Sequence, residues 1–512
     1  MTSDQISQFE KKVIIRNIGP ADFAKIIALQ HICFPNMIPW KIEQLESHIR
    51  IFPEGQICVE LDGEIIGSCS SLTVNFDDYL EQHTYSEITD KGYIRNHNPH
   101  GGSLYGMEVM VHSDYRRMKI GRRLYEARKR LAEKLNLRGI IVGGRIPGYH
   151  KHSDKMTPRE YAEEVLQQNI YDPVLTFQMM NGFTLKRIIT NYLPDDDDSK
   201  NFAALLEWNN IDYKPSNSKT HYKLSFPVRI CVIQYMMKKI DSFEEFATQC
   251  EHYVDVSADY KSDFAVFPEN FTMQLLSFLE ERSPSLAIRK LTTFTVQYVE
   301  LFSELAVKYN VNIIGGSHFV EENNRIYNVG HLFRRDGTIE QQYKLHISPN
   351  ERKWWGINGG TKLEVFDTDC GKISIQLSSD IEYPEVSRIV AEEGAQIIFV
   401  PFCAEDRQAF LRIKYCAQAR AIENQVFTVT AGTVGNLTHV DNVDIQYAQS
   451  GVYTPADFSF PRDGIAGECS ENTETVIMAE VDMEILQRHR KSTDVLTFRD
   501  RRTDIYSLQI RS

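Results

Sequence analysis

Short runs of β-branched and aromatic residues recur along the second half of the chain and limit it to a layered fold. Each run is long enough for one buried strand, and helix-like segments separate several of them. The predicted strands are 229–235, 263–267, 311–315, 328–333, 372–377, 396–402, 426–431 and 475–481, and the predicted helices are 293–308, 386–393 and 409–423. Strands that alternate with helices indicate an α/β architecture in which helices cover the sheets.

The first half shows the same alternation. We expect strands at 13–17, 104–112 and 139–143, and a hairpin within 55–72 around the turn Asp62-Gly63. A helix is expected after Pro20, and residues 74–103 are expected to form a long loop. Apolar residues at helical spacing predict a further helix over 119–135, with one buried face formed by Ile120, Leu124, Ala127, Leu131 and Leu135.

The length of 512 residues favours more than one domain. Residues 211–226 are polar, contain Pro215 and Ser216, and follow an acidic run at 195–198. An apolar strand-like run begins directly after them. We therefore predict a boundary near residue 220, giving domains 1–220 and 221–512, each long enough for its own core.

Charge and hydropathy exclude several classes of protein. Lys and Arg number 57 against 70 Asp and Glu, a net charge of −13, which argues against a general nucleic-acid binder. No apolar run approaches the length of a membrane-spanning helix, so no membrane partner is expected. The first residues, MTSDQISQFEKK, contain no apolar core of a secretory signal, and the nine cysteines form no CxxC pair. We expect a cytoplasmic protein with reduced thiols.

A basic turn joins the predicted strand that ends near Val111 to the predicted helix at 119–135. Five cations fall within eight residues: Arg116, Arg117, Lys119, Arg122 and Arg123. Backbone N–H groups at a helix start favour anions, and guanidinium groups there would complete a diphosphate site. The alternative is a solvated basic face.

Strand, turn and helix together resemble the acetyl-CoA motif of the GNAT acyltransferases, [R/Q]-x-x-G-x-[G/A]. Arg116 matches its first position and Gly121 its last, while Lys119 replaces the middle glycine. The resemblance extends over residues 12–210. It implies a GNAT-like α/β domain that binds acetyl-CoA through residues of this turn, namely Val111, Arg116, Arg117, Lys119, Gly121 and Arg122.

Two further positions of this half concern the transfer chemistry. The family often carries a tyrosine as general acid where this chain has Gln178, and an amide cannot deliver a proton. Glu108 is a candidate base for the acceptor amine, with an ordinary strand carboxylate as the alternative. The pairs His97/His100 and His150/His152 have no third ligand at a telling spacing, so we expect loop residues and no metal.

Three segments of the second half carry candidate chemistry. Glu269 follows Pro268 at the end of a predicted strand, and partial burial there would raise its pKa. Lys344 and Glu351 lie seven residues apart, and a lysine beside carboxylates can stabilise an oxyanion. Ser378 opens a polar turn after the strand predicted at 372–377. Taken singly, each of these features is commonplace in structural roles.

In this order the segments resemble the nitrilase (carbon–nitrogen hydrolase) superfamily, which uses a Glu-Lys-Cys triad on an αββα sandwich. The resemblance extends over 227–505 and implies hydrolysis of an amide or nitrile C–N bond. Glu269 corresponds to the base, Lys344 and the backbone N–H of Ser379 to the oxyanion site, and Glu351 to a second, orienting glutamate. The order of the two halves resembles a bacterial fusion family. It implies a small amide, nitrile or amine substrate and a homodimer or larger assembly, with residues 409–423 as a candidate interface.

Ser378 occupies the position of the nucleophilic cysteine. A serine hydroxyl is far less acidic than a thiol, so three explanations stay open: an engineered replacement, a natural loss of hydrolysis, or slow catalysis by serine. Two functions follow, an amidase-type hydrolase fused to an acetyl-CoA-dependent N-acyltransferase, or an inactive or regulatory CoA- and amide-binding protein. Cys403 is expected near Ser378 as a small buried residue or an alternative nucleophile. Trp354 and Trp355 would line the substrate pocket or pack in a core or interface.

Overall fold

The computed structural model describes residues 9–506 and 508, except 11, 36, 80–81, 195, 215–226, 280, 282, 439, 441–442, 444 and 492–496. Contacts divide the chain into two compact units, Lys12–Leu224 and a second that joins Met1–Lys11 to Ser225–Ser512. The boundary predicted near residue 220 lies outside the described residues, as does the first residue of the acidic run at 195–198. Among the described helices, none is both long and apolar enough to cross a membrane.

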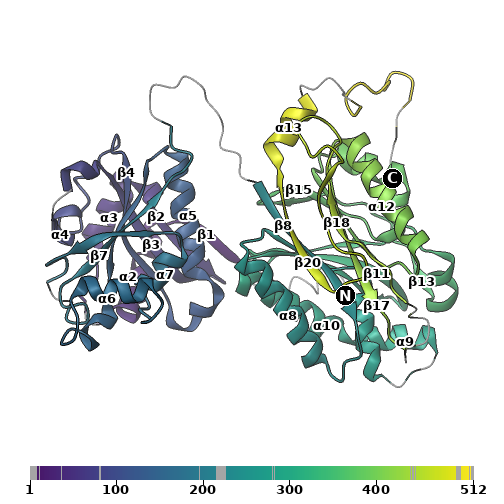
Figure 1. Ribbon diagram of the computed structural model, residues 1–512, viewed down its shortest axis with the longest axis horizontal. Coiled ribbons are helices and arrows are strands. Elements are labelled where there is room, and N and C mark those ends of the chain that lie inside the picture. The colour runs from purple at the N-terminus through teal and green to yellow at the C-terminus, as the bar shows by residue number, and fades with distance from the viewer. Residues whose placement is uncertain are drawn as a thin grey trace. The chain divides into compact units, whose positions relative to one another are not determined.

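The N-terminal unit is one twisted sheet covered by helices (Figure 1). The strand order is β1-β2-β3-β4-β5-β7-β6, and β4 and β5 form its parallel pair. The strands are β1 (Val13–Asn17), β2 (Gln56–Leu61), β3 (Glu64–Val74), β4 (Ser103–Val111), β5 (Gly139–Arg145), β6 (Thr184–Ile189) and β7 (Ala203–Asn209). The helices are α2 (Phe23–Cys33), α3 (Ile42–Ile51), α4 (Tyr85–Ile88), α5 (Ile120–Lys134), α6 (Pro158–Leu166) and α7 (Leu175–Met180).

Most of the elements predicted for this unit are confirmed. The hairpin turns at Asp62 and Gly63, both with positive φ, as a tight two-residue turn requires. The prediction of a loop over residues 74–103 is wrong in one part, because α4 lies inside it. Thr84 caps that helix and exchanges hydrogen bonds with Glu87, a local signal at its N-terminus.

The helix α5 is confirmed, but its buried face is wider than predicted. Leu135 follows the helix and is 40% exposed, so its place on the buried face is wrong. Tyr125 and Arg128 are buried instead, at 3% and 1% exposure. The Arg128 Nη2 donates to the carbonyl oxygens of Ser70 at 3.0 Å and Glu108 at 2.7 Å, whereas its buried Nε has no hydrogen-bond partner.

The C-terminal unit contains the sheet path β12-β11-β10-β9-β8-β17-β16-β15-β14. All eight predicted strands and all three predicted helices are confirmed, with ends shifted by a few residues. The strands are β8 (Pro227–Met237), β9 (Phe264–Val266), β10 (Asn312–Glu322), β11 (Arg325–Phe333), β12 (Ile339–Tyr343), β13 (Ile357–Asn358), β14 (Phe366–Thr368), β15 (Gly371–Ile375), β16 (Ile397–Phe402), β17 (Phe427–Gly435), β18 (Gly451–Tyr453), β19 (Ile465–Glu468) and β20 (Thr475–Asp482). The helices are α8 (Phe243–Asp259), α9 (Pro284–Leu291), α10 (Thr295–Tyr309), α11 (Pro384–Glu392), α12 (Arg407–Asn424) and α13 (Met483–Lys491).

Three apolar clusters show that this unit is an αββα sandwich. Along β8, Cys231 and Ile233 pack with α8 and α10, whereas Ile230 and Val232 face strands of the other half of the sheet. The rings of Phe264 and Phe399 meet at 5.0 Å between the halves. A third cluster joins β16 to α11 and α12. Figure 1 shows α8 and α10 on one side of the strands and α12 on the other. The predicted fold class is confirmed.

The strand directions bring four chain segments to one edge of the sandwich. Strands β15, β16, β17, β8, β9 and β10 form a continuous parallel series. The antiparallel steps from β10 to β11 and from β11 to β12 give β12 the same direction. The residues that follow β9, β12, β15 and β16 therefore emerge at the carboxyl ends of the strands, where α/β sheets hold their ligands.

Candidate active site

Glu269 follows β9 and is buried, at 1% exposure. Its Oε1 accepts a hydrogen bond from Asn328 Nδ2 at 3.0 Å and lies 2.9 Å from Lys344 Nζ. Burial raises the pKa of Glu269 to about 7, against the opposing effect of Lys344. A carboxyl group with this pKa can take up and return a proton near neutral pH.

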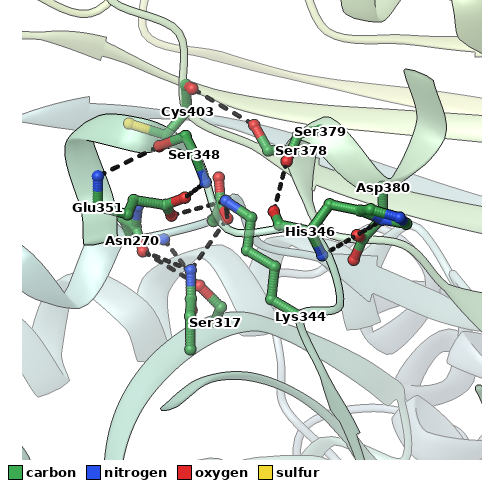
Figure 2. Close-up of polar contacts among 12 residues, drawn as sticks. Asn270, Ser317, Lys344, His346, Ser348, Glu351, Ser378, Ser379, Asp380 and Cys403 are labelled. Carbon is green, nitrogen blue, oxygen red and sulfur yellow. Dashed lines mark hydrogen bonds and ion pairs between the residues drawn. The ribbon is translucent and has the colours of Figure 1, made fainter. Parts of the chain in front are cut away.

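Lys344 follows β12 and contacts two carboxylates. Its Nζ lies 2.6 Å from Glu351 Oε1 in addition to the contact with Glu269, and the lysine is 3% exposed. Burial opposes the charge, but the two carboxylates raise the pKa of Lys344, so the ammonium group stays protonated. Figure 2 shows the lysine side chain extended toward Glu351.

Glu351 begins a short π-helical turn, Glu351–Trp355. Its Oε2 accepts a hydrogen bond from the Ser348 backbone N–H at 2.8 Å. Burial would raise the pKa of Glu351, but Lys344 and Ser348 together hold it below its ordinary value. The carboxylate therefore stays ionised and fixes the position of the lysine.

Ser378 is the first residue of a short 3₁₀ turn after β15, Ser378–Glu382, and has φ at +43°. A non-glycine residue in this region is strained, and such strain is commonly found where a side chain must be aimed into a site. The serine is 7% exposed, and its Oγ donates to the Cys403 carbonyl oxygen at 3.5 Å (Figure 2). The neighbouring Ser378 hydroxyl is a minor influence on Glu269 that opposes the rise of its pKa by burial.

Asp380 ties the Ser378 turn to the segment after Lys344. Its carboxylate accepts hydrogen bonds from the backbone N–H groups of Leu345 at 3.1 Å and His346 at 2.8 Å. The His346 Nδ1 lies 2.8 Å from the same carboxylate, and the His346 ring stacks on Tyr383 at 3.6 Å. The two segments are therefore held in fixed register, which preorganises the groups between them.

Of the other candidates, Cys403 follows β16 beside Ser378, as predicted. Its Sγ donates to Gln446 Oε1 at 2.7 Å, and burial together with the charge of Glu269 raises the pKa of the thiol to about 12. A thiol of this pKa is a poor nucleophile. The two tryptophans differ, because Trp354 is 48% exposed whereas Trp355 packs on Phe319 at 5.7 Å.

A cavity of about 940 Å³ opens in the N-terminal unit. The β4–β5 pairing runs from Ser103 with Gly139 to Gly106 with Val142, and both strands continue past it, so they diverge beside the cavity. Glu108 and Gln178 line the wall, and each has one fully buried oxygen without a hydrogen-bond partner. Burial raises the pKa of Glu108 to about 7, although a hydrogen bond with Ser70 and the charge of Arg128 act to lower it.

The basic turn contributes to this cavity only in part. Val111, Arg116 and Gly121 line it, whereas Arg117, Lys119 and Arg122 belong to the same turn without being part of the described wall. Arg122 bonds to Glu126 at 2.9 Å. Lys119 caps α5 with φ at +53°, the left-handed conformation that a glycine adopts without strain. The chain keeps the backbone shape of the motif despite the substitution.

The histidine pairs proposed as loop residues lie in or near turns. His97 Nδ1 accepts from the Thr73 N–H at 3.1 Å and stacks on Phe52, and His150 Nδ1 lies 2.7 Å from the Pro147 carbonyl oxygen. Within the described part of the chain, no group of three His, Cys, Asp or Glu side chains gathers as metal ligands do.

Comparison with known proteins places this geometry in a family. Residues 229–491, just over half of the chain, match the model of the carbon-nitrogen hydrolase family. A probable hydrolase of Bacillus subtilis, YhcX, is 64% identical over 504 residues and covers 98% of both chains. The chain belongs to the carbon-nitrogen hydrolase family. A yeast protein named omega-amidase NIT3 is 26% identical over 302 residues, which are 56% of this chain and 96% of that protein.

The N-terminal unit of this hydrolase-family chain belongs to a second family. Residues 23–147 match the acetyltransferase (GNAT) family. An uncharacterized N-acetyltransferase of Bacillus subtilis, YkwB, is 39% identical over 207 residues, 40% of this chain and 91% of that protein. The two resemblances inferred from the motifs are thereby confirmed, and the chain combines both families.

Sequence reasoning missed several residues that hold the hydrolase-family site together. Asn328 donates to both Glu269 and Asn270, the latter at 3.1 Å, from within a buried strand. In the sequence, Asn328 is marked only as a single amide side chain within an apolar run. Gln446 accepts from both Cys403 and Thr433, the latter at 3.1 Å, and no local pattern marks it. Such residues act across strands far apart in the sequence.

Proposed function

We propose that the C-terminal unit hydrolyses amide C–N bonds of small molecules. The observation that carries the proposal is the buried group of Glu269, Lys344 and Glu351 next to the strained turn at Ser378. One cation between two carboxylates, beside a nucleophile position at the carboxyl ends of the strands, is an arrangement for acyl transfer. The name of the yeast relative, an omega-amidase, favours amides over nitriles.

In the proposed mechanism, the side chain at 378 attacks the amide carbon while Glu269 takes its proton. Lys344 and the backbone N–H of Ser379 stabilise the oxyanion that forms. Glu269 then returns the proton to the departing nitrogen, and the C–N bond breaks to leave an acyl-enzyme. Water, deprotonated by Glu269, hydrolyses that ester or thioester. Glu351 takes no proton and holds Lys344 in place.

Ser378 favours a second candidate function for this unit. A hydroxyl is a much weaker acid than a thiol, and Glu269 with a pKa of about 7 is a weak base for it. A chain that keeps the whole site around a serine would bind an amide and turn it over slowly or not at all. That behaviour suits a regulatory or scaffolding protein.

The substitution Ser378→Cys tests which function applies. A thiol beside Glu269 should react with iodoacetamide ahead of Cys403, whose thiol burial keeps protonated. Ammonia release from an amide panel should rise by orders of magnitude over the native chain. Ser379→Cys, the adjacent position, is the matched control. Labelling no faster than Cys403, with no turnover of any amide, would favour the regulatory reading.

We further propose that the N-terminal unit binds acetyl-CoA and transfers the acetyl group to an amine. The residues fit such a ligand, because Arg116 and Gly121 line the cavity at the start of α5 and two buried oxygens on its wall lack partners. Bound acetyl-CoA would supply the acyl thioester. Val111, Arg116, Arg117, Lys119, Gly121 and Arg122 are the proposed contacts of its pyrophosphate arm.

Calorimetry of CoA binding to the full chain tests this proposal. Heat of binding is expected for the native chain at moderate salt and is expected to be lost when Arg116→Ala is combined with Arg122→Ala. Arg159→Ala, on the exposed side of α6, is the control for a general loss of positive charge. Absence of heat with the native chain would refute CoA binding.

A further inference from the structure

The cavity of the N-terminal unit contains a phenol group that the motif does not predict. Tyr125 lies one turn into α5 and lines the cavity together with Glu108 and Gln178. It is 3% exposed, and Phe177 and Phe183 hold its ring edge-on at 5.3 Å each. The phenol is therefore fixed in position and faces a cavity rather than the bulk solvent.

Gln178 lies next to this phenol. Its side chain fills the space beside Gly144, where a Cβ would collide with it. Burial raises the pKa of the Tyr125 phenol, and Arg128 and a hydrogen bond with Gln178 oppose that rise. Gln178 therefore sets the environment of a proton donor although it cannot be one. Gln178 stands where the family often carries a tyrosine. It therefore belongs to one local cluster with the Tyr125 ring.

The cavity lining also contains a candidate proton acceptor. Glu108 lies on β4 beyond Gly106, the last residue that pairs with β5, and its buried Oε2 has no hydrogen-bond partner. Arg128 donates to the Glu108 carbonyl oxygen and also lies 5.6 Å from the Tyr125 ring centroid. One arginine thus connects the strand that carries the carboxyl group with the helix that carries the phenol.

We propose that Tyr125, in place of the residue at 178, gives its proton to the thiolate that leaves during acyl transfer, while Glu108 takes a proton from the attacking amine. The inference rests on the proposed acyltransferase function. The amine nitrogen forms a bond to the acyl carbon and loses a proton to Glu108. The carbon–sulfur bond breaks, and the sulfur takes the proton of the Tyr125 hydroxyl. Exchange with water returns both groups to their starting states.

Phenol and thiolate would be hydrogen-bonded in the product complex, and this contact can be measured without an acceptor. A hydrogen bond to a charged acceptor stabilises the thiolate, so it lowers the pKa of the bound CoA thiol. Titrating the ultraviolet absorbance of the thiolate in the CoA complex, with the desulfo-CoA complex as the blank, reports that pKa. The blank removes the contribution of the protein's own cysteines.

The decisive variant is Tyr125→Phe, which keeps the ring contacts and removes the hydroxyl. The pKa of the bound thiol should rise by about one unit relative to the native chain. Tyr171→Phe, at an exposed tyrosine on the cavity rim, should leave it unchanged. Adding Gln178→Tyr to Tyr125→Phe should lower it again, because a phenol is restored next to the lost one.

Turnover provides a second readout. With acetyl-CoA and a panel of primary amines, Tyr125→Phe should lower kcat about 100-fold and leave the KM for acetyl-CoA unchanged. A bound thiol that titrates at the same pH in the native chain and in Tyr125→Phe would overturn the inference about Tyr125 but not the acyltransferase proposal. Failure of the native chain to bind CoA would refute the acyltransferase proposal, and the inference with it.

Discussion

The charge of Glu269 should make the stability of the C-terminal unit depend on pH. Glu269, Lys344 and Glu351 carry a net charge of −1 in a buried site when all three are ionised. Burial raises the pKa of Glu269 from 4.5 to about 7. Between these values the folded chain holds a proton that the unfolded chain has released, so the free energy of unfolding falls as pH rises. The loss amounts to about 3 kcal/mol and is complete above pH 7.

Glu269→Gln removes this dependence. The amide stays neutral at every pH, and its oxygen can still accept from Asn328 and Lys344. The attraction of Lys344 is already part of the pKa of about 7, so the loss of this ion pair does not further reduce the stability gained by the variant. Relative to the native chain, the variant should gain about 3 kcal/mol between pH 4.5 and pH 7 and no more at higher pH.

Urea denaturation of the full chain at several pH values measures this gain. The transition that shifts between the native chain and the variant belongs to the C-terminal unit and can be followed by the fluorescence of Trp354 and Trp355. Glu393→Gln, at an exposed carboxylate after α11, is the control and should show no such trend. A difference between Glu269→Gln and the native chain that is constant from about pH 5 to 8 would refute the reasoning.

Three other predictions concern backbone strain, a buried charge and assembly. Lys119→Gly should raise the free energy of unfolding by up to about 1 kcal/mol in thermal melts, because it removes a left-handed non-glycine residue. A fall of the same size in the free energy of unfolding would contradict this account. Arg128→Met should cost about 3 kcal/mol in urea denaturation, since it leaves two buried carbonyl oxygens without donors. Light scattering should give at least a dimer, because α12 exposes Tyr415 and Ile422, whereas a mass near 59.1 kDa at micromolar concentration would refute it.

The strands of the C-terminal unit could be predicted because the sandwich buries both of their faces. A run such as β8 is then apolar at all but a few positions, Arg229 and Gln234 among them, and its composition alone marks it as a strand. Glu269 could be found because it closes the predicted strand 263–267 in a Pro-Glu pair. Lys344 follows β12, whose sequence IEQQY is not an apolar run and was not predicted as a strand, so its spacing from Glu351 was the signal that marked it. The strand directions bring Glu269 and Lys344 together in space. The sequence indicated this contact only through the resemblance to a family whose motifs occur in the same order.

The contacts within the sites could not be predicted in the same way. Asp380 stands two residues after Ser378, yet its partners lie after β12, and only the relative placement of β12 and β15 determines the pairing. Along α5, the apolar period correctly placed Ile120 and Leu124 in the core. It gave no reason to bury Tyr125 and Arg128, because their burial depends on backbone carbonyls and a cavity supplied by other elements.

Both units contain a carboxyl group whose pKa burial raises to about 7, and the difference in their surroundings separates their proposed roles. Lys344 contacts Glu269 directly, whereas Arg128 donates to backbone carbonyls beside Glu108 and leaves Oε2 of that carboxyl group without a partner. These surroundings suit the proposed roles, in which Glu269 takes a proton from a nucleophile within the protein and Glu108 takes one from a bound amine. Each acts as a base only when ionised, so both rates should rise as pH increases through about 7. Because the two glutamates lie in separate units, Glu108→Gln should abolish this rise for acetyl transfer and leave the pH profile of ammonia release by Ser378→Cys unchanged. A change in both profiles would contradict independent bases.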